Sequence, residues 1–65
     1  MADNQVFTYL LNEIKKLRHD QETFLSSGRV ADYAEYRHIC GVIRGLTHAE
    51  STVKDLVQKM EYSDE

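Results

Sequence analysis

The sequence predicts an all-α fold: an antiparallel two-helix hairpin, completed by oligomerisation or by docking on a larger assembly. Two long segments carry apolar residues at alternating spacings of three and four, which is typical of a helix with one narrow apolar face. A short Ser-Ser-Gly break separates the two segments, and short connections make neighbouring helices antiparallel. The chain has no proline and only three glycines, a composition that disfavours disorder and an all-β fold.

We expect the first helix over residues 4–26, with Met1 and Ala2 loose and with Asp3 or Asn4 as its N-cap. The residues predicted to face the second helix, which we call the helix–helix seam, are Phe7, Leu10, Ile14, Leu17 and Phe24, with Leu11 and Leu25 widening it on one side. Gln21 is the polar exception in this row. It either fixes the register of the helix pair or lies near a hydrated end of the seam.

The turn is expected over residues 27–31. Gly28 can adopt the left-handed conformation that ends a helix without steric cost. Asp32 followed three residues later by Glu35 resembles a capping box and predicts the start of a second helix over residues 32–61. The acidic tail at residues 62–65 should fray, because negative charge at a helix C-terminus opposes the helix dipole. The domain assignment is therefore one helical hairpin over residues 1–65.

The second helix continues the predicted seam through Ile39, Ile43 and Leu46. This helix is expected to be longer than the first one, so that its end projects beyond its partner. Apolar residues in or near that projection are predicted to contact a partner; they are Val53, Leu56, Val57 and Met60.

A second set of predicted partner contacts lies nearer the start of this helix. Its members are aromatic residues and arginines, which often anchor interfaces, and two glycines inside the helix: Tyr33, Tyr36, Arg37, Gly41, Arg44 and Gly45. The tyrosines could equally cover the open end of a thin core. The glycines, with Ala49 at the same spacing, indicate either close approach of another backbone or a locally soft helix.

A chain of 65 residues forms one small domain, whose core alone gives marginal stability. Cys40 is the only cysteine, so an internal disulfide cannot form, and the three histidines do not have the spacing of zinc ligands. His38 and Cys40 are two residues apart on a helix and therefore point in different directions. We expect no cofactor, no metal and no enzymatic activity, and we expect self-association or docking to stabilise the fold.

The formal net charge is −3, whereas general polyanion binders are basic. One basic cluster, comprising Lys15, Lys16, Arg18 and His19, could contact a phosphate backbone or an acidic protein surface, or could simply be a solvated helix face. No segment has the apolar length of a membrane span, and the N-terminus lacks the pattern of an export signal. We therefore expect a soluble protein with no membrane partner.

Three segments carry a resemblance to a known family: 27–37 (SGRVADYAEYR), 41–46 (GVIRGL) and 55–61 (DLVQKME). Together with the leading amphipathic helix, they resemble small helical-hairpin proteins encoded in the virion-assembly gene clusters of tailed bacteriophages. The resemblance implies a non-enzymatic structural or interaction protein of the capsid, portal or head-to-tail connector. It also implies a location in the virion, and in the host cytoplasm during assembly, with no catalytic residues.

Two other functions are compatible with a small helical hairpin. One is a dimer of hairpins that binds nucleic acid, an architecture found in ROP. In that case Lys15, Lys16 and Arg18 would lie on the binding face, although the net charge disfavours it. The other is a small phage-encoded inhibitor of a host protein that binds through the surface between Tyr33 and Arg44.

Overall fold

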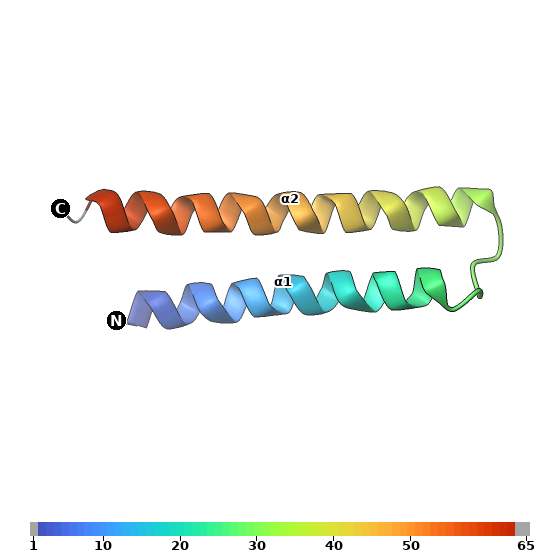
Figure 1. Ribbon diagram of the computed structural model, residues 1–65, viewed down its shortest axis with the longest axis horizontal. Coiled ribbons are helices and arrows are strands. Elements are labelled where there is room, and N and C mark those ends of the chain that lie inside the picture. Colours follow the sequence, from blue (N-terminus) through green and yellow to red (C-terminus); the bar gives the residue numbers. More distant parts are fainter. Residues whose placement is uncertain (1, 64–65) are drawn as a thin grey trace.

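The computed structural model shows an antiparallel hairpin of two long helices, α1 (Ala2–Ser26) and α2 (Tyr33–Ser63), lying side by side (Figure 1). It describes residues 2–63, with side chains described for residues 5–61. The Cα atoms extend over 51 × 16 × 11 Å, so the molecule is a flat rod. The predicted all-α helical hairpin is confirmed.

The helix ends differ slightly from those predicted. Helix α1 begins at Ala2, so Asp3 and Asn4 lie inside its first turn and not before it. Helix α2 includes Tyr62 and Ser63, which were expected to belong to the fraying tail. The expectations for Met1, Asp64 and Glu65 fall outside the described residues.

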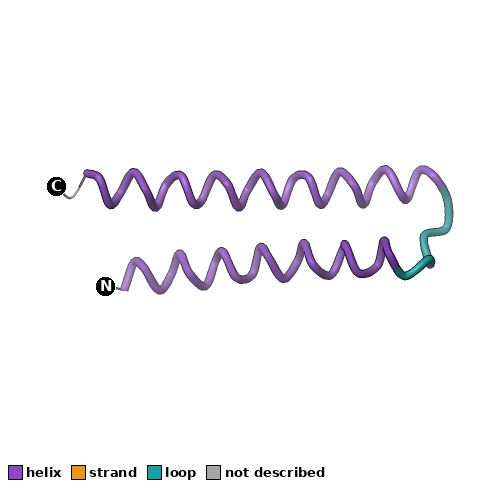
Figure 2. Tube along the Cα trace, viewed as in Figure 1, coloured by secondary structure: helices purple, strands orange, loops and turns teal. Residues whose placement is uncertain are grey.

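The turn between the helices (teal in Figure 2) is stabilised by local hydrogen bonds. Gly28 has a φ of +81°, the left-handed conformation expected of a glycine that follows a helix C-terminus. The Ser27 amide and hydroxyl both donate to the carbonyl oxygen of Phe24, at 3.1 Å and 2.6 Å, and the Arg29 amide donates to Ser27 Oγ at 3.2 Å. These bonds satisfy backbone groups that the end of α1 leaves unpaired.

Asp32 and Glu35 cap the start of α2 as the sequence predicts. The Glu35 amide donates to Asp32 Oδ1 at 2.8 Å. In return, the Glu35 carboxylate accepts a hydrogen bond of 2.7 Å from the amide of Ala31, one residue before Asp32, whose amide is the usual donor of this reciprocal bond. The Tyr36 amide donates to the Asp32 carbonyl at 3.1 Å, which is the first bond of the helical ladder.

The core between the helices is thin. Among the described side chains, Ile14 and Ile39 are the only apolar ones that are buried, at 9% and 4% exposure. Half-buried side chains on either side of this pair complete the observed seam: Phe7, Leu11, Gln21 and Leu25 from α1, and Ile43, Leu46, Val53 and Val57 from α2. Arg18 on α1 and Glu50 on α2 occupy the remaining two seam positions.

The predicted seam is wrong at three positions of α1. Leu10 and Leu17 are 41% and 52% exposed and Phe24 is half-buried, and Leu11, Arg18 and Leu25 occupy the corresponding seam positions. Both rows share Phe7, Ile14 and Gln21, so the spacing alone cannot choose between them. The structure selects the row through Arg18 because this side chain pairs with a carboxylate that the seam buries, and an unpaired buried charge costs more than an exposed leucine.

Candidate interaction surfaces

A buried carboxylate lies at the middle of the seam. Glu50 is 7% exposed and fills the α2 position between Leu46 and Val53. Arg18 Nη1 from α1 donates a hydrogen bond to Glu50 Oε1, and Lys54 Nζ lies 3.2 Å from Glu50 Oε2 on the same helix. Lys15 Nζ approaches Oε2 to 4.0 Å. One carboxylate thus meets three cations, two of which come from the opposite helix.

These contacts hold Glu50 in its charged form. The hydrogen bond from Arg18, followed by that from Lys54, lowers the pKa of the Glu50 carboxyl below its ordinary value. Arg18 also lies 3.5 Å from Thr47 Oγ1, one turn earlier on α2. A hydrogen-bonded ion pair between two helices favours a single register, because sliding either helix by one turn would separate the partners.

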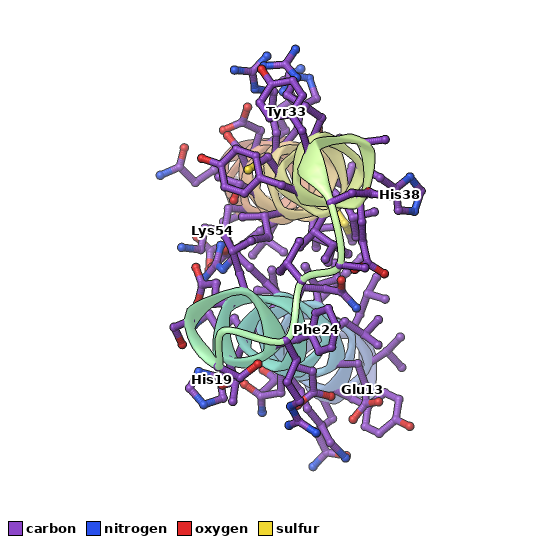
Figure 3. The ribbon with its side chains drawn as sticks, turned by 90° about the vertical axis from the view of Figure 1, so that its right-hand side faces the viewer. Glu13, His19, Phe24, Tyr33, His38 and Lys54 are labelled. Atoms are coloured by element: carbon purple, nitrogen blue, oxygen red, sulfur yellow. The ribbon has the colours of Figure 1, made fainter. Side chains whose placement is uncertain are left out.

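The predicted basic cluster is therefore divided between two environments. Lys15 and Arg18 turn toward Glu50, whereas His19 is exposed and its Nε2 lies 3.5 Å from Thr23 Oγ1 on its own helix. Figure 3 shows His19 and Lys54 on the same side of the hairpin. Neither of the two sequence interpretations of this cluster anticipated a structural role for it. The sequence feature that could have indicated this role is Glu50, a charged residue in the otherwise apolar row of the second helix.

Partly exposed apolar side chains occur on the side of the hairpin opposite to His19 and Lys54. Leu17 and Ala49 each precede a member of the Arg18–Glu50 pair, so this ion pair places them at the same level of the hairpin. The residues seven positions before and after Leu17 and Ala49 are also apolar, and they lie on nearly the same helix faces. These six residues form the apolar flank: Leu10, Leu17 and Phe24 on α1, and Val42, Ala49 and Leu56 on α2.

The apolar flank is partly exposed along its length. Leu10, Leu17 and Leu56 are 41%, 52% and 46% exposed, and the other three members are half-buried. Figure 3 shows Phe24 and His38 on the side of the hairpin that is opposite to His19 and Lys54. The hairpin therefore has one flank rich in charge and one flank that is mostly apolar.

The predicted partner contacts at the start of α2, apart from Gly45, lie away from the apolar flank. The rings of Tyr33 and Tyr36 stack at a centroid distance of 6.1 Å, and both side chains are exposed. The interaction with the Cys40 thiol raises the pKa of Tyr36 above its ordinary value. Arg37, Cys40, Gly41 and Arg44 line a depression of about 90 Å³.

The two helix glycines make no close contact within the hairpin. A Cβ atom added at Gly41 or Gly45 would meet nothing within 4 Å in the described structure. These glycines therefore face outward, and the hairpin alone does not explain them. The structure does not bring Gly45 into the depression that contains Gly41.

The prediction of a projecting apolar end needs correction for two of its residues. Val53 and Val57 are half-buried and follow Glu50 in the seam, because α1 begins at Ala2 and covers more of α2 than expected. Leu56 and Met60 are more exposed, at 46% and 37%. Leu56 belongs to the apolar flank, so the exposed surface runs along the hairpin and is not confined to its end.

Neither helix, over the residues that the structure describes, combines the length and apolarity needed to cross a membrane. The described side chains form no group of three or more His, Cys, Asp or Glu residues able to hold a metal ion. Comparisons of this chain with protein-family models, with curated proteins and with solved structures find no match.

Proposed function

We propose that this chain is a non-enzymatic interaction protein that acts through its apolar flank and completes its own fold by contact with other proteins. The observation that supports the proposal is the imbalance of burial. Among the side chains that the structure describes, two apolar ones, Ile14 and Ile39, are buried, whereas Leu10, Leu17 and Leu56 of the apolar flank are between 41% and 52% exposed. Contiguous exposed apolar surface on a small domain is characteristic of a protein-binding site.

We further propose that the assembly is the virion of a tailed bacteriophage, with the hairpin bound at the capsid, portal or head-to-tail connector. The support for this step is the resemblance carried by residues 27–37 and 41–46. In this proposal the protein is present in the host cytoplasm during assembly and in the finished virion.

Quantitative mass spectrometry of gradient-purified particles and of assembly intermediates tests the virion proposal. We expect the chain to co-sediment with particles at a constant ratio to a major structural protein, and to stay with them after a high-salt wash. Loss of the chain from both particles and intermediates would refute this assignment. It would leave open a role as an inhibitor of a host protein, which pull-down from host lysate would detect.

The nucleic-acid alternative receives less support from the geometry. Lys15 and Arg18, two of the three cations on which it depends, interact with the Glu50 carboxylate. Pairing with a carboxylate reduces the positive field available to a phosphate backbone. Filter binding at low salt separates the two proposals, because a phosphate-binding protein would show tight binding that weakens steeply with added salt.

A further inference from the structure

We infer that the apolar flank binds a second copy of this chain, and that α1 of each copy lies against α2 of the other with the two turns at the same end. The product is a four-helix bundle whose two-fold axis runs along the hairpins. This inference rests on the proposed function as an interaction protein and names its first partner. The virion assignment is independent of it.

The dimensions of the apolar flank suit a dimer of this size. The broad face of the hairpin, which contains both helices, measures 51 × 16 Å between Cα atoms, or about 800 Å². A standard stable interface buries about 800 Å² on each partner. The flank spans four turns of each helix, from Leu10 to Phe24 and from Val42 to Leu56. A second hairpin of the same length therefore covers it completely.

The side-chain sizes favour pairing of α1 with α2. On the apolar flank α1 presents Leu10, Leu17 and Phe24, which are large. The middle of the corresponding face of α2 is made of small residues, Ala49 and its neighbour Gly45, at which an added Cβ would meet nothing within 4 Å. Large side chains of one helix pack best into the space left by small residues of the other. Pairing like helices would place Leu17 against Leu17 and Ala49 against Ala49, which overpacks one contact and leaves a void in the other.

The charges at the edges of the apolar flank favour the same arrangement. Glu13 and Asp20, seven residues apart, border the flank on α1. On α2 the corresponding edge carries His38, Gly45 and Thr52, which include no carboxylate. Figure 3 shows Glu13 and His38 on the same side of the hairpin. If α1 met α1 of the second copy, two acidic edges would face each other, and like charges at an interface disfavour that partner geometry.

Analytical ultracentrifugation of the purified chain tests whether the apolar flank is the interface. We expect a dimer of the 7.6 kDa chain, and we expect Leu17→Glu to weaken dimerisation by about tenfold or more, because the carboxylate would be buried without a partner. Tyr9→Glu is the matched control, since Tyr9 is 67% exposed on α1 but lies outside the flank. We expect this variant to dimerise like the wild type. A wild-type monomer, or a Leu17→Glu variant that dimerises normally, would overturn the inference.

The relative direction of the two copies requires a distance measurement. A spin label at Arg29→Cys, in a Cys40→Ser background, lies in the exposed turn and outside the helix–helix contacts. Pulsed electron paramagnetic resonance should then give a label-to-label distance far shorter than the 51 Å length of the hairpin. A distance close to that length would place the turns at opposite ends and refute the proposed pairing.

The same experiments separate this inference from the proposed function. If the chain is monomeric but co-sediments with virions, the partner on the apolar flank is another virion protein and the inference fails alone. If the chain forms the predicted dimer but is lost from particles and intermediates, the virion assignment fails and the inference stands.

Discussion

At the scale of single residues, Glu50 decides how the two helices face each other. Its carboxylate is buried in the seam and is paired with Arg18 and Lys54. Removing one member of such a group leaves an uncompensated buried charge. The substitution therefore lowers the stability of the fold by more than the ion pair itself contributes. The rotation of α1 that brings Arg18 inward also moves Leu10 and Leu17 outward, onto the apolar flank.

The stability of the hairpin should fall in acid through the titration of Glu50. The hydrogen bonds from Arg18 and Lys54 lower the pKa of this carboxyl in the folded state, so its contribution is fully present above the ordinary value of about 4.5 that applies to the unfolded chain. That contribution is lost as the pH falls through the lowered pKa of the folded state. We expect Glu50→Gln to reduce the melting temperature at pH 7 and to flatten its decline between pH 5 and about pH 2. Circular dichroism melts across this range measure both effects.

Glu22→Gln provides the matched control for this titration. Glu22 is an exposed glutamate on α1, so its replacement removes the same charge without touching the seam. We expect its acid profile to follow that of the wild type. Equal profiles for Glu50→Gln and the wild type would show that the pairing of Glu50 does not contribute to stability.

Residue-scale geometry also marks the limit of what the sequence reveals. The two candidate rows of α1 share Phe7, Ile14 and Gln21, and both have helical spacing. Choosing between them requires knowing that Glu50 is buried opposite α1, which is a property of the pair and not of either helix. The exposure of Leu10 and Leu17 followed from that choice, and so the apolar flank could not be located from the spacing.

At the scale of elements, the turn is the part of the chain that its local sequence predicts best. Its conformation depends on local groups: the positive φ of Gly28 and the reciprocal hydrogen bonds of Asp32 and Glu35. Local interactions of this kind can be predicted from neighbouring residues, and both the glycine and the capping pair were predicted correctly. The exact helix ends were predicted less well, because terminal turns depend on small differences in capping energy.

Two glycine-to-alanine substitutions should have opposite effects on stability. Gly28→Ala forces a side chain into the left-handed region and should reduce the free energy of unfolding by about 1 kcal/mol. Gly41→Ala removes the flexibility of a glycine inside α2, where the new Cβ meets nothing within 4 Å, and should increase it by about 1 kcal/mol. Urea unfolding followed by circular dichroism measures both.

The pair of variants also tests the interpretation of the second helix. A loss of stability in Gly41→Ala would show that another backbone approaches this position closely in the native assembly. No shift in Gly28→Ala would contradict the assignment of that residue to the left-handed region.

At the scale of the whole molecule, folding and association should be coupled. The hairpin is a single layer of two helices, so each helix can bury only one of its faces inside the chain. The two isoleucines that are buried within residues 5–61 form a small core, and domains of about this size usually depend on a disulfide, a metal or a partner for stability. Cys40 has no second cysteine with which to form a disulfide within the chain.

The melting temperature should therefore rise with protein concentration. When a dimer dissociates as it unfolds, mass action favours the folded state at higher concentration. We expect a measurable increase between about 1 μM and about 100 μM, because a higher concentration favours the associated folded chains over the separate unfolded ones. Circular dichroism follows the transition, in cells whose path length is matched to the protein concentration. The Leu17→Glu variant is the control, because its weaker dimer should melt at a lower temperature than the wild type at each concentration in this range. A wild-type chain that is compact at the lowest concentration, with a melting temperature that dilution does not change, would show that the two helices are stable without a partner.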